Sequence, residues 1–123
     1  MGGTAGATGL GGAAGTGGGT CLPDLVVPWS VVQNVLGDPL ITCAQAGADH
    51  TELDVNGVTF AQSCPANANG GEFVIPLADR GTYTLDAFLV TPNGSALSEA
   101  HPPTISVGCD GLRTPTIILP VNL

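Results

Sequence analysis

Lysine is absent from this chain of 123 residues, and its two arginines, Arg80 and Arg113, stand against ten acidic residues, giving a formal net charge of −8. So few positive charges cannot neutralise a phosphate backbone, and nucleic-acid binding is therefore excluded. The absence of lysine also excludes Schiff-base chemistry and lysine isopeptide crosslinks.

Aromatic residues and long apolar runs are scarce as well. The chain has one Trp, one Tyr and three Phe, so a core built from it has few large side chains. No apolar run approaches the length of about 20 residues that crosses a bilayer, and we expect no membrane span. The N-terminus shows neither a basic region nor an apolar leader. We therefore expect that the sequence begins at an artificially chosen residue or derives from a trimmed precursor.

Glycine is abundant in one segment, the N-terminal residues 1–20. Residues 2–20 are Gly, Ala, Thr and a single Leu, with glycine at every third position from Gly3 to Gly18. Polyproline II helices have this period, but the proline that collagen uses is missing, so we do not expect a stable triple helix. Two interpretations stay open: a flexible spacer, or an arm that bundles with other copies into a stalk or fibre core.

Residues 21–123 have a different sequence pattern, in which short apolar runs are separated by turn dipeptides every eight to twelve residues. This pattern is typical of an all-β protein, and we expect an antiparallel, Ig-like β-sandwich of about seven or eight strands with almost no helix. Prolines at 28, 115 and 120 mark the first and last strands as edge strands or as sites of a bulge. The expected strand regions are Leu25–Val32, Leu40–Ala44, Thr51–Cys64, Phe73–Leu77, Thr82–Val90, Ser95–Glu99, Thr104–Gly108 and Thr116–Leu123.

The clearest element is a β-hairpin around the dipeptide Asn56-Gly57. This dipeptide readily takes the positive φ angles of a type I′ turn, and a two-residue loop fixes the register of the strands. Val55 then faces Val58 and Leu53 faces Phe60. The residues expected on the core side are Leu53, Val55, Val58, Phe60 and Cys64.

Four cysteines stand at Cys21, Cys43, Cys64 and Cys109. An even number in a small domain with few aromatic residues favours disulfides and an oxidising compartment. A zinc site is the weaker alternative, because no two cysteines lie close together in the sequence. We prefer the pairs Cys43–Cys64 and Cys21–Cys109, whose loops contribute about 3 and about 4–5 kcal/mol in the chain-entropy estimate.

One polar cluster could hold a metal ion. His50, Glu52 and Asp54 alternate with Leu53 and Val55, so they project from the outer face of the hairpin at intervals of roughly 7 Å. They are a weak metal candidate, for a divalent cation such as calcium, and no other cofactor is implied. The alternative is an ordinary solvated face of a half-buried hairpin.

A second polar pair resembles part of a catalytic triad. Asp86 and His101 come opposite each other if Asn93-Gly94 closes a hairpin. The nucleophile is missing, because no serine lies in a Gly-x-Ser-x-Gly motif, so a surface ion pair is the better interpretation. We therefore name no catalytic or cofactor-binding residue and expect no enzyme.

The apolar side chains of Phe88, Val90 and Leu97 lie on the second face of their strands. If the other face alone forms the core, these three residues form a contact patch for a partner. The alternative is that a loop or a second layer covers them.

Residues 75–85, IPLADRGTYTL, resemble the "apolar strand, short turn, Gly-x-Tyr-x-apolar" segment of carboxypeptidase-regulatory-like and transthyretin-like domains. The resemblance extends loosely over residues 58–90. It implies a transthyretin-like sandwich of a secreted bacterial surface protein, without catalytic activity, that serves as a spacer, adhesion or assembly module. The lysine isopeptide bonds of some adhesin relatives cannot occur here, and the cysteines replace them.

From the arm, the edge strands and the resemblance, we expect a non-enzymatic structural or assembly module at the cell surface or outside the cell, such as a subunit of a filament or appendage. Its partners would be further copies or other cell-surface proteins. The alternative is a tethered module of a secreted or lipid-anchored protein that binds carbohydrate or protein. Carbohydrate binding would need exposed aromatic side chains, and few are present.

Overall fold

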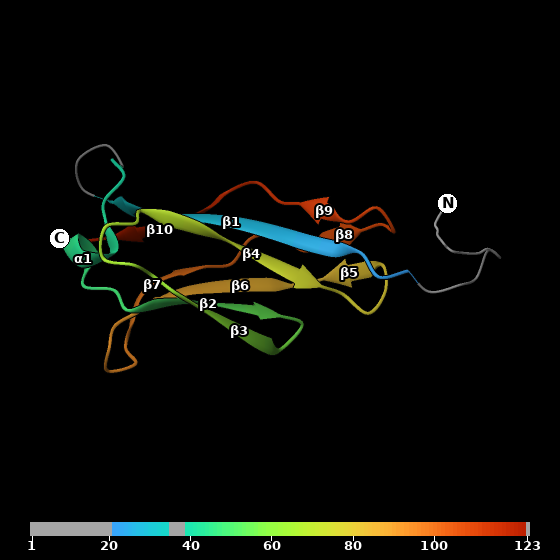
Figure 1. Cartoon of the computed structure of the whole chain (residues 1–123), viewed down its shortest axis with the longest axis horizontal. Coiled ribbons are helices and arrows are strands. Elements are labelled where there is room, and N and C mark those ends of the chain that lie inside the picture. The colour runs from blue at the N-terminus through green and yellow to red at the C-terminus, as the bar shows by residue number, and fades with distance from the viewer. Residues whose placement is uncertain (1–20, 35–38, 123) are drawn as a thin grey trace.

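The computed structural model describes residues 21–34 and 39–122, so the expectations for the arm, residues 1–20, lie outside the described residues. The described part contains ten strands and one helical turn (Figure 1). The expected all-β class is therefore confirmed. The elements are β1 Asp24–Gln33, α1 Cys43–Ala46, β2 His50–Val55, β3 Val58–Ser63, β4 Gly70–Pro76, β5 Gly81–Tyr83, β6 Leu85–Val90, β7 Ala96–Ala100, β8 Ile105–Val107, β9 Leu112–Arg113 and β10 Ile117–Val121.

The strands form two layers, seen one above the other in Figure 1. The upper sheet has the order β10-β1-β4, with β9 also paired to β1, and the lower sheet has the order β3-β2-β6-β7. Strands β5 and β8 pair separately at one end. Most pairs are antiparallel as expected, but β1 pairs in parallel with both β10 and β9. Parallel neighbours need a long connection, and β1 and β10 satisfy this as the first and last strands of the described chain.

The core lies between the two sheets and follows the two-residue period of the strands. On β1, for example, Leu25, Val27, Trp29 and Val31 are buried and alternate with more exposed neighbours. Other strands of the two sheets contribute the inward residues Leu53 and Val55 of β2, Phe73 and Ile75 of β4, Leu85, Ala87 and Leu89 of β6, and Ile117, Leu119 and Val121 of β10, among others.

The hairpin of β2 and β3 has the predicted turn and register. Asn56 and Gly57 both have positive φ, at 50° and 86°, as a type I′ turn requires. Val55 pairs with Val58 and Leu53 with Phe60. The prediction that Val58 belongs to the core is wrong, because its side chain is 58% exposed. β3 is the outermost strand of its sheet, so the opposite sheet covers it less than it covers β2.

Pro28 was expected to make the first strand an edge or a bulged strand, yet β1 lies in the centre of its sheet. On the side of β1 that faces away from β4, two strands pair with it in turn. β9 pairs at Leu25 and Val26, and β10 pairs from Trp29 onward. The Val26 carbonyl accepts a hydrogen bond from Thr114 N on that side, so the nitrogen of Pro28, two residues on, faces the same way. It meets the gap between β9 and β10, where no donor is needed.

The prediction of a strand at Leu40–Ala44 is wrong. Only Leu40 pairs with a strand, through a single bridge to Val32 of β1. The chain forms α1 instead, because Thr42 and Gln45 make a capping box: Thr42 Oγ1 accepts from Gln45 N, and Gln45 Oε1 accepts from Thr42 N. Gly47 ends the helix in the left-handed conformation.

The predicted strand Thr82–Val90 divides at Thr84 into two strands that belong to different sheets. β5 pairs with β8, whereas β6 pairs with β2 and β7. Thr84 is held by the hairpin turn, since its N–H donates to Asn56 Oδ1 at 2.7 Å and its carbonyl accepts from Asn56 N at 3.0 Å.

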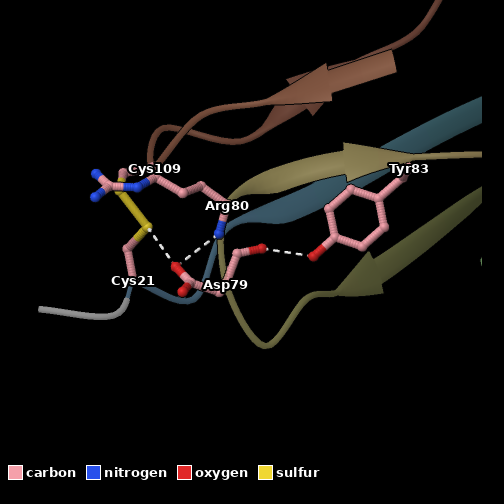
Figure 2. Close-up of a disulfide and its surroundings, with 5 residues drawn as sticks. All are labelled: Cys21, Asp79, Arg80, Tyr83 and Cys109. Atoms are coloured by element: carbon pink, nitrogen blue, oxygen red, sulfur yellow. Dashed lines mark hydrogen bonds between the residues drawn. A yellow bond between two sulfur atoms is a disulfide. The ribbon is translucent and has the colours of Figure 1, made fainter. Parts of the chain in front are cut away.

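Two disulfides join the preferred pairs of cysteines. Cys43–Cys64 closes a separation of 21 residues, and Cys21–Cys109 closes one of 88 residues (Figure 2). Cys43 and Cys64 are buried, whereas Cys21 is half-buried and Cys109 is exposed. Two disulfides in so small a domain indicate that the protein folds in an oxidising compartment.

Candidate functional site

The residues proposed for a metal site lie on the outer face of β2, as their alternation predicted. His50, Glu52 and Asp54 are half-buried, whereas Thr51, Leu53 and Val55 between them are buried. His50 is engaged by carboxylates on both sides: Nδ1 lies 2.8 Å from Asp49 Oδ2 and Nε2 lies 2.8 Å from Glu52 Oε2.

Asp54 takes no part in this group and instead accepts a hydrogen bond from Thr59 Oγ1. Within residues 21–34 and 39–122, no group of three or more His, Cys, Asp or Glu side chains is arranged to hold a metal ion. The structure therefore does not unite His50, Glu52 and Asp54 as ligands of one cation.

Asp86 and His101 meet, as the hairpin register predicted. His101 Nδ1 lies 2.7 Å from Asp86 Oδ1, and Nε2 lies 3.1 Å from Glu99 Oε1. The predicted register holds at Ala87–Ala100 and Phe88–Glu99, although the loop is longer than two residues and a bulge follows Leu89. Both ring nitrogens face carboxylates, so His101 has the same surroundings as His50.

The carboxylates stabilise the protonated form of each imidazole. The hydrogen bond to Glu52, followed by that to Asp49, raises the pKa of His50 above its ordinary value of 6.5. The hydrogen bond to Asp86, followed by that to Glu99, raises the pKa of His101 in the same way. A positive charge on each ring offsets part of the negative charge around it.

These groups make the outer side of the lower sheet an acidic face. Glu52, Phe88 and Glu99 form one row across β2, β6 and β7, and Asp54 pairs directly with Asp86 in the next row. The two arginines lie elsewhere. Arg113 pairs with Glu72 of the upper sheet at 2.7 Å, and Arg80 lies beside the Cys21–Cys109 disulfide.

The predicted contact patch of Phe88, Val90 and Leu97 does not form as an exposed apolar surface. Val90 is buried and Leu97 packs partly against the core, which leaves only Phe88 on the outer face. The physical reason is the bulge between Leu89 and Val90, because a bulge lets two consecutive side chains turn to the same side. The half-buried Phe88 ring packs edge-on against the imidazole of His101, with 6.1 Å between the ring centroids.

A stronger candidate for contact with a partner is the side of the sandwich between β7 and β10, which we call the open side. β7 and β10 are terminal strands of their respective sheets and lie against each other, but no backbone pairing joins them. Val121 O accepts from Asn34 N, so Val121, Leu119 and Ile117 direct their backbone groups toward β1. Ile118 and Pro120 therefore direct theirs away from the sheet, and Pro120 has no N–H to leave unpaired.

An apolar groove of about 520 Å³ lies at one end of this open side, where β7 ends and β10 begins. Leu85, Ala100 and Ile105 line it together with the segments 101–104 and 114–118. Pro102 and Pro103 follow β7 after His101, and because proline cannot donate a hydrogen bond, the chain leaves the sheet there. Ile118, whose side chain is 48% exposed, also lines the groove.

The opposite side of the sandwich, between β3 and β4, is closed by side chains. Gln62 of β3 reaches across, where its Oε1 accepts from Trp29 Nε1 and its Nε2 donates to the Glu72 carbonyl. The two sides of the sandwich therefore differ: hydrogen bonds join the sheets on one side, and an apolar groove lies between them on the other.

The sequence interpretation recognised the edge character of the last strand from Pro120 but missed the groove. The available signals were the dipeptide Pro102-Pro103 and the Thr114-Pro115 pair, which interrupt pairing on the two strands that border it. Their closeness in space arises from tertiary structure.

Comparisons with protein-family models, with curated protein sequences and with solved structures found no match to this chain. The described part of the chain forms no helix that is long and apolar enough to span a bilayer.

Proposed function

We propose that this chain is a non-enzymatic structural module of a cell-surface or extracellular assembly, such as a filament or appendage, whose copies join through the open side of the sandwich. The observation that carries the proposal is the outward-facing backbone of β10 beside the apolar groove. An open edge strand accepts an extended segment from another molecule through backbone hydrogen bonds, and the adjoining groove accepts its apolar side chains.

The resemblance of residues 75–85 to transthyretin-like domains supports the same proposal, since it implies a spacer, adhesion or assembly module. The disulfides are consistent with a position outside the cell. The resemblance and the disulfides support the proposed class of protein. The open side provides the surface through which copies would associate.

Charge opposes self-association, because each copy carries a formal net charge of −8. Most of the lining of the groove is apolar, and His101 is its one titratable side chain among the described residues. His101 also contacts Asp86 and Glu99, so the acidic face borders the groove, and its carboxylates must be screened by salt or divalent cations. We expect assembly to increase with ionic strength or calcium.

The test is light scattering and electron microscopy of the full chain over a range of concentrations, with and without calcium and added salt. We expect species larger than the monomer when charge is screened, and less assembly when residues 2–20 are deleted. Ile118→Lys should abolish assembly, because it sets a charge in the groove. Val74→Lys is the matched control, since Val74 is exposed to 59% on β4, away from the open side.

A chain that stays monomeric under all these conditions would contradict the proposal. Equal loss of assembly in the Ile118 and Val74 variants would show that the open side is not the joint. A monomer would favour the alternative, a tethered module that binds protein or carbohydrate. Trp29 cannot serve as a stacking platform for a sugar, because its side chain is only 3% exposed.

A further inference from the structure

The two disulfides differ in their access to solvent and in the charges beside them. Cys43 is fully buried and Cys64 is 6% exposed, so no external reagent reaches their bond in the folded protein. Cys109 is exposed and Cys21 is half-buried. The Cys21–Cys109 bond is therefore the one that an external thiol can reach.

The two sulfur atoms of this bond have oppositely charged neighbours, which Figure 2 shows on either side of it. Arg80 Nη1 lies 3.5 Å from Cys109 Sγ, and Asp79 Oδ1 lies 3.8 Å from Cys21 Sγ. Asp79 is held in place locally, since its Oδ1 accepts from Arg80 N at 2.8 Å and its carbonyl accepts from the Tyr83 hydroxyl at 2.6 Å.

We propose that the Cys21–Cys109 disulfide is a thiol-exchange site, at which an external thiolate attacks Cys21 Sγ and releases Cys109 as a thiolate beside Arg80. The bond between the incoming sulfur and Cys21 forms as the Cys21–Cys109 bond breaks. The electron pair of the broken bond passes to Cys109 Sγ, so the incoming thiol is the only co-reactant.

The direction of attack follows from where negative charge accumulates. In thiol–disulfide exchange, the better-stabilised thiolate leaves faster. A thiolate on Cys109 is stabilised by the guanidinium of Arg80, whereas a thiolate on Cys21 would lie beside the carboxylate of Asp79. The mixed disulfide should therefore form on Cys21, the residue that directly follows the N-terminal arm.

The consequence is a covalent attachment point for a thiol at the base of the arm, independent of the groove between β7 and β10. Small-molecule thiols and protein thiols share the reactive group, so both are candidate partners. Exchange with a small thiol does not require association between copies, so its outcome is separate from that of the assembly experiment.

The test uses the folded full chain and 2-mercaptoethanol, a small thiol that carries no charge other than that of its reactive thiolate. The reaction is stopped at short times with iodoacetamide, and the products are mapped by peptide mass spectrometry. We expect the mercaptoethanol adduct on Cys21, alkylation on Cys109 and an intact Cys43–Cys64 bond. An adduct mainly on Cys109, or simultaneous opening of both disulfides, would overturn the proposal.

Charge variants test the role of Arg80. Arg80→Gln should slow opening severalfold, because a less stabilised thiolate on Cys109 leaves more slowly. Arg113→Gln is the matched control, because it removes the same charge from a residue paired with Glu72. Asp79→Asn should speed opening, since it removes the carboxylate beside the attacked sulfur. Equal slowing in the two arginine variants would attribute the effect to net charge and refute the site.

Single cysteine variants give a second readout that does not depend on exchange kinetics. In Cys21→Ser the free thiol of Cys109 should react with iodoacetamide at neutral pH faster than the free thiol of Cys21 does in Cys109→Ser. Adding Arg80→Gln should remove most of this advantage. If the Cys21 thiol reacts as fast as that of Cys109, the charge asymmetry does not act on the sulfurs and the proposal fails. Circular dichroism shows whether each variant is folded.

Repeating the exchange reaction of the wild-type chain and of Arg80→Gln with glutathione extends the test to an anionic thiol. Glutathione carries a net negative charge, so Arg80 should assist both its approach and the departure of Cys109. We expect Arg80→Gln to slow glutathione more than 2-mercaptoethanol. An identical slowing with both thiols still supports the leaving-group role, whereas no slowing with either thiol overturns it.

A peptide that carries one cysteine tests whether the site also accepts protein thiols. If it forms the mixed disulfide on Cys21 as 2-mercaptoethanol does, the site accepts protein thiols. If only the small thiols react, the site is restricted to small-molecule thiols.

Discussion

Trp29 Nε1 donates a hydrogen bond of 2.9 Å to Gln62 Oε1, and this bond joins β1 of the upper sheet to β3 of the lower sheet. Gln62 also donates from Nε2 to the Glu72 carbonyl on β4 at 2.7 Å. One amide side chain therefore ties three strands together on the closed side. The arrangement also explains how a polar indole N–H is accommodated on a Trp side chain that is almost fully buried.

The first prediction concerns Gln62. In Gln62→Leu the buried Trp29 N–H loses its acceptor and the Glu72 carbonyl loses a donor, so the free energy of unfolding should fall by about 1–3 kcal/mol. Urea denaturation followed by circular dichroism measures it, because this signal does not depend on the single Trp. In a Trp29→Phe background, which has no N–H to leave unpaired, Gln62→Leu should cost less. Equal costs in the two backgrounds would mean that the hydrogen bond contributes nothing.

Gly71 provides the second prediction, because it pairs with Trp29 across β1 and β4. A Cβ atom at Gly71 would lie 2.8 Å from the indole ring and 2.8 Å from Gln62 Oε1. Gly71→Ala should therefore displace the indole and lower the free energy of unfolding by about 1–3 kcal/mol. Gly108→Ala is the control, since a Cβ there meets nothing within 4 Å. An unaltered Trp29 emission spectrum in Gly71→Ala would contradict the prediction.

Local chemistry made part of this fold predictable. The Asn56-Gly57 turn determines the β2–β3 register because its backbone angles are set by two adjacent residues. The same logic gave the Asp86–His101 pair. The cysteine pairing followed from the positions of the cysteines relative to the hairpin and the domain ends. The capping box at Thr42 and Gln45 was also local, but the apolar residues beside it were interpreted as a strand.

Tertiary structure decided the features that the sequence interpretation missed. Pro28 fits a central strand only because β9 and β10 leave a gap beside it, and nothing near Pro28 in the sequence shows that gap. The groove likewise forms only because the Pro102-Pro103 segment lies near Ile118, and these residues are far apart in the sequence. Val90 turns inward because of a bulge, a one-residue irregularity that an alternating pattern does not reveal.

The third prediction concerns Thr51, whose hydroxyl is fully buried and has no hydrogen-bond partner in the described part of the chain. Thr51→Val keeps the shape of the side chain and removes the unpaired hydroxyl, so the free energy of unfolding should rise by about 1 kcal/mol. Thr59→Val is the control, because its exposed hydroxyl donates to Asp54 and should give no such gain. A loss of stability in Thr51→Val, measured by urea denaturation, would show that the hydroxyl has a partner such as a buried water.

The last prediction concerns pH. The carboxylates beside His50 and His101 raise the pKa of each imidazole in the folded protein above the ordinary value of 6.5. The folded state therefore binds protons more tightly than the unfolded chain does. The stabilisation is fully present below about pH 6.5 and is lost as pH rises through the raised folded values. NMR titration of the two imidazoles, with urea denaturation over the same pH range, measures both effects. Stability should fall across this window in the wild-type chain and stay nearly level in a His50→Gln, His101→Gln double variant. Stability that rises with pH in the wild type, or an equal fall in the double variant, would show that the two histidine–carboxylate groups do not control it.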